Sequence, residues 1–189
     1  MCNIFYIFVP TSCPKFDVPR IMKLIKTSLL AMALVCLAAS CSKDTSEEFT
    51  QESNYVIDLN LAMETDWDMA DEIMLLVNEH RANLGLEPIK SDLEYASAYA
   101  VDHTMYMIDV DKINHDNFVE RSQALKERGA KMVAENVAYG YSSAEDVVRA
   151  WLNSPGHRRV IEGQYTHSGF GVLKNSEGRY FYTQLFYRK

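Results

Sequence analysis

One stretch, residues 135–158, constrains the fold of this chain more than any other. It reads ENVAYGYSSAEDVVRAWLNSPGHR, with a carboxylate at its start and a histidine near its end. Ser142 and Glu145 have the spacing of a capping box, which predicts a helix that begins there. The helix has one apolar face, which includes Trp151, and Pro155 predicts its end. A capped helix with one apolar face therefore holds the two polar residues at its ends in fixed positions, as a functional site requires.

The N-terminal part of the chain is typical of an export signal. Met22 begins a basic segment, and residues 27–40 form an apolar run that is short for a membrane span. We therefore interpret residues 1–21 as lying upstream of the true start and residues 22–40 as a signal peptide. Residues 37–41 at the end of this segment read Leu-Ala-Ala-Ser-Cys and resemble the lipobox of bacterial lipoproteins. This resemblance predicts lipidation of Cys41 and anchoring to the outer membrane or cell surface. The alternative is a plain secretory signal that contains this cysteine.

Cysteine content and charge limit what the remaining domain can do. All four cysteines lie within residues 1–41, so the exported domain has none for a disulfide or a thiol nucleophile, and its core alone must stabilise it. Residues 1–41 carry +3 of the total net charge of −7, which leaves −10 on the remainder. An acidic domain is poorly suited to a phosphate backbone, so we expect no nucleic-acid partner and repulsion from anionic lipid headgroups.

The pattern after the lipobox indicates a tether followed by one domain. Residues 41–66 are polar and acidic, and we interpret them as a flexible tether whose apolar patch, residues 55–57, can dock on the fold. Residues 67–189 are expected to form the domain. Helical periodicity predicts three helices in this domain. The first covers residues 69–84, the second begins after a capping box at Ser91 and Glu94, and the third covers residues 119–128. Small residues in the second of these helices favour close packing against another element.

The C-terminal part changes to strand periodicity. Residues 165–173 and 179–187 are rich in aromatic and β-branched residues and flank a turn that contains Gly178, which predicts a hairpin. Helices followed by a terminal hairpin indicate an α+β fold, with helices covering an antiparallel sheet.

Histidine and carboxylate side chains are the candidates for chemistry, because the sequence contains no P-loop, HExxH or GxSxG motif. His115 lies in a polar loop, where an exposed imidazole and a functional one are equally consistent with the spacing. Glu135 lies inside an apolar run, and a buried carboxylate needs a partner, in a site or in a structural hydrogen bond. His157 follows the helix break, where capping of helix ends is the alternative role. The other histidines receive no site role: His80 and His103, expected to pack within helices, and His167.

Several ordered motifs carry a resemblance to a known family. Residues 135–138 match G-E-N-[LIV]-A, with Ala134 in place of the glycine, and residues 151–158 match W-x-x-S-P-G-H-R. Further matches lie at residues 76–81, 114–115, 169–171 and 182–186. Together they resemble the CAP superfamily, or SCP-like domains, of cysteine-rich secretory, antigen 5 and pathogenesis-related proteins, and its bacterial lipoprotein branch in particular. The resemblance covers residues from about 72 to 186 and implies a three-layer α-β-α sandwich with a central antiparallel sheet.

The resemblance also implies a site. The family cleft holds two histidines and two glutamates, which bind a divalent metal in some members. Carried over, His115 and His157 are the histidines and Glu135 is one glutamate, while Ser154 stands where eukaryotic members have the second. Two imidazoles and one carboxylate are a ligand set for Zn²⁺ with an open position for water, as in a hydrolytic site. The alternative is a hydrogen-bonded cleft without metal.

These inferences lead to one functional expectation and two alternatives. We expect an exported, lipid-anchored protein whose His/Glu cleft binds a ligand or protein partner. A metal-dependent hydrolase and a lipid or sterol carrier are the alternatives. The resemblance leaves the choice open, because one fold hosts several activities.

Overall fold

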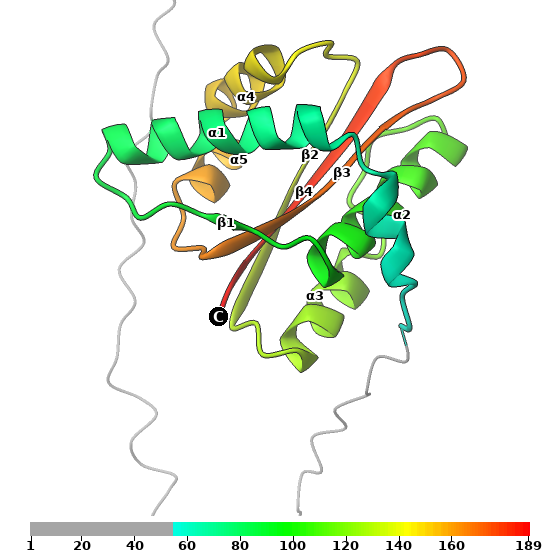
Figure 1. Ribbon diagram of the computed structural model, residues 1–189, viewed down its shortest axis with the longest axis horizontal. Helices are drawn as coiled ribbons and strands as arrows, with labels where there is room; N and C mark the ends of the chain where they lie inside the picture. The colour runs from blue at the N-terminus through cyan, green and yellow to red at the C-terminus, as the bar shows by residue number, and fades with distance from the viewer. Residues whose placement is uncertain (1–54) are drawn as a thin grey trace, which may run out of the picture. The chain divides into compact units, whose positions relative to one another are not determined.

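The computed structural model describes residues 55–189. The predicted upstream start, the signal peptide, Cys41 and the first part of the tether lie outside these residues. Helices cover both faces of a four-stranded sheet, so the described part forms three layers (Figure 1). The elements in chain order are η1 (Leu59–Glu64), α1 (Trp67–Asn83), β1 (Lys90–Ser91), α2 (Tyr95–Asp109), α3 (Phe118–Glu127), β2 (Met132–Tyr139), α4 (Ala144–Asn153), α5 (Pro155–Ile161), β3 (His167–Lys174) and β4 (Tyr180–Arg188).

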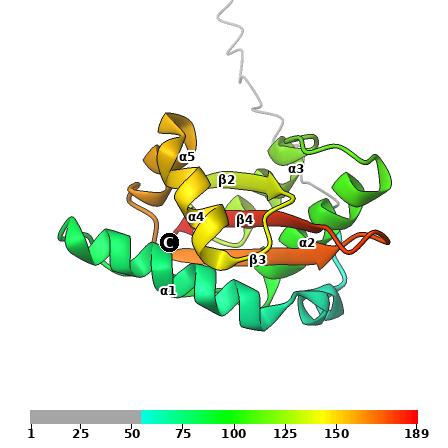
Figure 2. The same ribbon diagram turned by 90° about the horizontal axis from the view of Figure 1, so that it is seen from above.

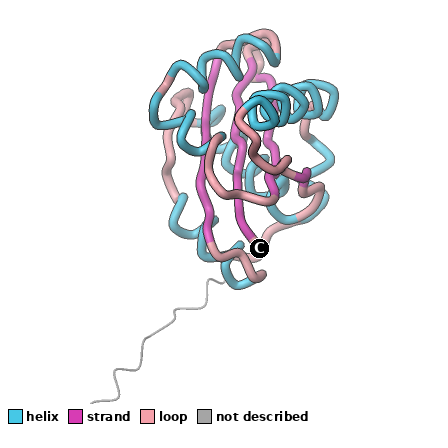
Figure 3. The backbone as a smooth tube through the Cα atoms, turned by 90° about the vertical axis from the view of Figure 1, so that its left-hand side faces the viewer, coloured by secondary structure: helices cyan, strands magenta, loops and turns pink. Residues whose placement is uncertain are grey.

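The sheet has the strand order β1-β3-β4-β2. The predicted terminal hairpin is confirmed as β3 and β4, which pair antiparallel around a turn where Gly178 has a φ of +78°. Strand β2 pairs antiparallel with β4 along its whole length and forms one edge of the sheet, while the two-residue β1 adds parallel to β3 at the other edge. Figures 2 and 3 show the strands lying between two groups of helices. The predicted α+β class and the α-β-α sandwich are confirmed.

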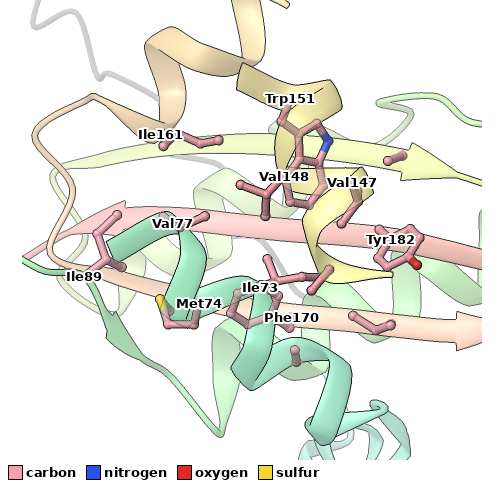
Figure 4. Packing of buried hydrophobic residues seen from close by; sticks show 14 of the residues in the cluster. Ile73, Met74, Val77, Ile89, Val147, Val148, Trp151, Ile161, Phe170 and Tyr182 are labelled. Atoms are coloured by element: carbon pink, nitrogen blue, oxygen red, sulfur yellow. The ribbon is translucent and has the colours of Figure 1, made fainter. Parts of the chain in front are cut away.

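The larger core lies between the sheet and helices α1, α4 and α5. Trp151 of α4 is 1% exposed, and its indole N–H donates to the carbonyl oxygen of Val137 in β2 over 3.1 Å. The indole therefore packs between helix and sheet, as the apolar face of this segment predicts (Figure 4). Around it pack Ile73, Val77, Val147, Val148, Ile161, Phe170 and Tyr182.

The opposite face of the sheet is covered by α2 and α3, and α2 lies unusually close to β3. A Cβ atom added at Gly169 would lie 2.2 Å from the carbonyl carbon of Ala96, and one added at Gly171 would lie 2.3 Å from the carbonyl oxygen of Ala100. Only residues without a side chain fit at these two positions. The close packing expected from the small residues of α2 is confirmed.

Two predicted helix starts are wrong, while the predicted end of α4 is confirmed. Ser143, not Ser142, is the N-cap of α4, and its hydroxyl accepts from the backbone N–H of Asp146. Ser91 does not cap α2, because pairing with β3 places it in β1, and the helix begins at Tyr95 without a side-chain cap. Helix α4 ends at Asn153, before Pro155, as predicted, but Pro155 at once begins a further helix. It takes the first position of α5, where its missing N–H costs no hydrogen bond.

The folded part begins before residue 67. Residues 55–66, which we expected to belong to the tether, pack on the domain: η1 contacts α2, and Ala62 and Thr65 are buried. Tyr55 stacks on Tyr99 with 5.2 Å between ring centroids, and its hydroxyl donates to the carboxylate of Asp102. The docking patch and the short helix η1 are therefore part of the fold. In the part of the chain that the structure describes, no helix has both the length and the apolar character needed to cross a membrane.

Candidate functional site

Glu135 lies in the middle of the edge strand β2, where it is buried and paired with a cation. The Nη2 atom of Arg121 lies 2.7 Å from Oε2 and 3.0 Å from Oε1, and its Nε lies 3.0 Å from Oε2. Both side chains are 1% exposed. Burial of a carboxylate is tolerated here because a guanidinium hydrogen-bonds both of its oxygens. The sequence indicated that Glu135 needs a partner but did not identify Arg121, which α3 supplies.

His115 is held by the same carboxylate. Its Nδ1 atom lies 2.8 Å from Oε1 of Glu135, and because an ionised carboxylate can only accept, Nδ1 carries the proton. The Nε2 atom of the neutral ring is then left with a lone pair. The side chain is 50% exposed. His115 therefore presents a hydrogen-bond acceptor to solvent in an orientation that a buried carboxylate fixes.

Two further donors fix the loop around His115. His103 Nε2 lies 2.9 Å from the carbonyl oxygen of Asn114, and Arg121 Nη1 donates to the carbonyl oxygen of Asp116 over 2.7 Å. The carbonyl groups of the residues before and after His115 are thus bonded to side chains that are themselves 1% exposed. The loop position is set by the buried network and not by the loop sequence alone.

His103 is the residue that sequence reasoning assigned to packing and that the structure places in the site. Its Nε2 atom is 3.8 Å from Oε1 of Glu135, and its buried Nδ1 has no hydrogen-bond partner among residues 55–189. Burial, and next the positive charge of Arg121, lower the pKa of His103 below its usual range, so the ring is neutral. The sequence did not indicate this role, because a histidine that only packs in the core would also lie on the apolar stripe of α2.

His157 lies in the first turn of α5, on the other side of the β2 edge. Its carbonyl oxygen accepts from Asn136 Nδ2 over 3.3 Å, while its ring makes no hydrogen bond within residues 55–189. Burial lowers the pKa of His157, and the proximity of His115 lowers it further. Ser154, predicted to line the same cleft, ends α4 and caps α5, and its side chain forms no hydrogen bond within the described residues.

A pocket of 370 Å³ lies against this network. His103 and Arg121 line it, together with Tyr55 from the N-terminal segment, Asp102 and Tyr106. Tyr106 stacks on His103 with 6.0 Å between ring centroids, and its hydroxyl donates to Asp116. The pocket is therefore bounded by α2, by the loop that precedes α3 and by the segment that precedes η1, and its lining does not include His115, Glu135 or His157.

The arrangement does not fit the three-ligand zinc shell that the resemblance implies. Both oxygens of Glu135 accept from Arg121, and one also accepts from His115, so the carboxylate faces a positive charge at hydrogen-bond distance. Within residues 55–189 no group of three or more His, Cys, Asp or Glu side chains could hold a metal ion. The set of His115, Glu135 and His157 as zinc ligands stays a prediction, and no chemical step is assigned to a metal here.

The fold and the motif residues agree with a known family. The model of the CAP (cysteine-rich secretory protein) family matches residues 74–186. The chain belongs to the CAP family. Glu135, His157 and the packing residue Trp151 all lie within the matched range, as do His103 and Arg121.

Similar sequences come from Bacillus subtilis (strain 168). The uncharacterized protein YkwD is 32% identical over 123 residues, which is 62% of this chain and 46% of that protein. The uncharacterized membrane protein YlbC is 31% identical over 125 residues, 62% of this chain and 34% of that protein. This chain thus spans less than half the length of these two relatives.

Solved structures share the fold. An extracellular SCP-domain protein from Bacillus anthracis str. Ames has a TM-score of 0.56 at 30% identity, covering 66% of this chain and 41% of that chain. An outer surface protein from Borrelia burgdorferi has a TM-score of 0.58 at 21% identity, covering 65% of this chain and 93% of that chain. At that identity the second likeness concerns the fold alone.

Proposed function

We propose that this chain is an exported, lipid-anchored CAP-domain protein that binds a polar ligand or a protein partner through His115 and His157. Export is supported by the signal-like segment over residues 22–40 and by a similar protein described as extracellular. Attachment of lipid to Cys41 supplies the anchor, at the outer membrane or the cell surface.

One observation carries the binding role: a half-exposed imidazole is fixed by a buried ion pair. Glu135 holds the ring of His115, and His103 and Arg121 hold the carbonyl groups of the residues before and after it. Preorganisation of this kind reduces the entropy lost on binding. The free Nε2 accepts from a hydroxyl, amide or ammonium group, and the neutral ring of His157 offers one donor and one acceptor nearby. The ligand chemistry expected is therefore a polar group that carries hydrogen-bond donors.

The test compares two histidine variants in ligand-observed NMR. Small alcohols, amides and carboxylates are screened against wild type, His115→Gln and His80→Gln. His80 is a matched control, because it is also partly exposed and hydrogen-bonded to one carboxylate, that of Glu162. Alcohols or amides should bind wild type and His80→Gln and lose binding with His115→Gln. Identical binding to all three proteins would contradict the proposal.

A second candidate, lipid binding, is favoured by an apolar groove between α1 and α4. The groove has a volume of 360 Å³, and Leu76, Val148 and Leu152 line it, with Arg149 beside them. An acyl chain fits the apolar part of this surface, whereas the charges at its edge are mixed, because Glu145 also lines it and Arg149 pairs with Asp146. Leu76→Glu should abolish binding of a fluorescent fatty acid while leaving fragment binding at His115 unchanged. Equal fatty-acid affinity of the variant and wild type would remove this candidate.

A further inference from the structure

A separate pocket of 460 Å³ lies at the end of the sheet where β3 begins and β4 ends. Its walls come from the segment before α2, from the end of α3 and from the two strand ends. It shares no lining residue with the His115 site. Three basic side chains line it: Arg128, His167 and Lys189.

Two of these basic groups are held in place by neighbours. The guanidinium of Arg128 lies over the ring of Tyr95 at 4.3 Å from its centroid, and its Nη1 donates to the carbonyl oxygen of Ala124 over 2.9 Å. His167 stacks on Tyr187 with 5.0 Å between centroids. The hydroxyl of Thr166 lies 2.8 Å from its Nδ1, and a Thr166 O–H that donates there leaves an N–H on Nε2 of His167. The pocket thus holds fixed hydrogen-bond donors.

The acidic side chains of the pocket differ in what they do. The carboxylate of Asp92 accepts from the hydroxyl of Tyr187 over 2.8 Å and from the backbone N–H of Glu94 over 2.9 Å. These donors are neutral, so the negative charge of Asp92 remains in the pocket. Glu94 is exposed, and its carboxylate forms no hydrogen bond within residues 55–189. Both carboxylates therefore oppose an anion, and Glu94 is the one that can be neutralised without loss of a wall contact.

The surroundings of the pocket are basic although the chain is acidic overall. Lys90 pairs with His167 in the sheet register, and Lys131 donates its backbone N–H to Arg188 at the adjoining strand ends. Burial lowers the pKa of His167, and Lys189 and Lys90 lower it further, while Asp92 raises it. Charges of both signs line the pocket itself, so an anion would be held by directed hydrogen bonds from Arg128, His167 and Lys189 and not by an excess of positive charge.

We propose that this pocket binds the phosphate group of a small phosphomonoester or of a lipid headgroup. A guanidinium, an ammonium and an imidazole N–H converge on one cavity of ordinary ligand size, and each donates to phosphate oxygens. The inference does not rest on the role proposed for His115. The proposal also predicts that removal of the Glu94 charge strengthens phosphate binding, whereas removal of a basic side chain weakens it.

The first test is a titration of the full-length ¹⁵N-labelled chain with sodium phosphate, at an ionic strength kept constant with sodium chloride. Resonances of residues 91–95, 128, 167 and 187–189 should shift and saturate. Arg128→Gln and Lys189→Gln should each weaken binding about five- to tenfold, as loss of one charge-assisted contact implies. Glu94→Gln should strengthen it about two- to threefold. Lys112→Gln, which removes an exposed loop charge outside the pocket, should change nothing.

Three outcomes would overturn the proposal. Shifts that do not saturate, or an effect of Lys112→Gln as large as that of Arg128→Gln, would mean general screening and not a site. Weaker binding by Glu94→Gln would assign the pocket to a cation or a neutral polyol. Lys189 is exposed, so its variant keeps the test valid if loss of Arg128 perturbs the fold.

A second arm separates the two sources of phosphate. Glycerol phosphate is titrated in solution, and co-sedimentation is measured with phosphatidylcholine vesicles with and without phosphatidylglycerol. Binding in either arm that Lys189→Gln reduces supports the proposal and identifies the source. No binding in both arms would refute it.

Discussion

Replacement of Arg121 by methionine tests the buried network most directly. The substitution keeps much of the side-chain volume and removes the guanidinium that bonds both oxygens of Glu135 and the carbonyl oxygen of Asp116. Arg121 and Glu135 are each 1% exposed, so water cannot replace the lost bonds without rearrangement. Removal of one partner of a buried ion pair costs about 3–5 kcal/mol of unfolding free energy. A domain of this size has about 5–15 kcal/mol in total, so the expected loss is a large fraction.

The assay is urea unfolding at neutral pH, with two comparison proteins. With an m-value of about 1–3 kcal/mol/M, Arg121→Met should lower the midpoint by at least about 1 M. The double variant Arg121→Met/Glu135→Gln should be more stable than the single one by about 1–3 kcal/mol, because no buried charge is then left unpaired. Arg149→Met is the matched control. That arginine pairs with Asp146 on the surface, where such pairs contribute about 0–1 kcal/mol.

Two results would refute this reasoning. A loss with Arg121→Met no larger than with Arg149→Met would mean that the pair is not a buried one in solution. Additive losses in the double variant would show that the Arg121 and Glu135 side chains do not interact. Either result would also remove the physical basis for a preorganised His115.

The remaining predictions concern the core, pH, the anchor and metal. Trp151→Ala should cost about 3–5 kcal/mol in urea melts, and a loss under about 1 kcal/mol would contradict its buried position. Because the pKa of His103 is lowered in the folded state, the ring is protonated in the unfolded state below about pH 6.5 while it is still neutral in the folded state. Stability should therefore fall as the pH decreases through 6.5, and His103→Gln should show a shallower decline in urea midpoints. Cys41→Ala should release the protein from membranes, and retention after a high-salt wash would place the anchor elsewhere. If Zn²⁺ binds, calorimetry should show an affinity that falls with acidification and with His157→Ala, whereas equal affinities or no binding would remove the metal prediction.

Much of the fold could be predicted because its signals are local. The helical periodicity of residues 69–84 and the turn at Gly178 each depend on neighbouring residues, and both elements form where expected. The boundary errors have the opposite cause. Ser91 has the local pattern of a cap, but pairing with β3 takes its backbone into the sheet. Strand β2 was not predicted, because Glu135 interrupts its apolar pattern. A buried carboxylate is tolerated there because Arg121 on α3 pairs with it.

The site could be predicted in part for the same reason. His115 and Glu135 stand in motifs that resemble a family, and they lie 2.8 Å apart. Arg121 and His103 do not lie in such motifs. Arg121 follows the first turn of a short amphipathic helix, and His103 lies on the apolar stripe of α2. Their roles depend on contacts over 14 residues to Glu135 and over 11 residues to Asn114. No periodicity or spacing rule encodes contacts of that kind.

The pairing of Glu135 with Arg121 also decides between the two roles that a buried carboxylate can have at this position. A metal ligand must offer its negative charge to a cation, whereas here a guanidinium already takes both oxygens. A metal that used Glu135 would have to displace Arg121, which would then be a buried cation without a partner, or compete for the single contact with His115. Orientation of the imidazole needs neither change. The geometry therefore favours Glu135 as the group that positions His115, which agrees with our proposal that the ring of His115, and not the carboxylate, contacts the ligand.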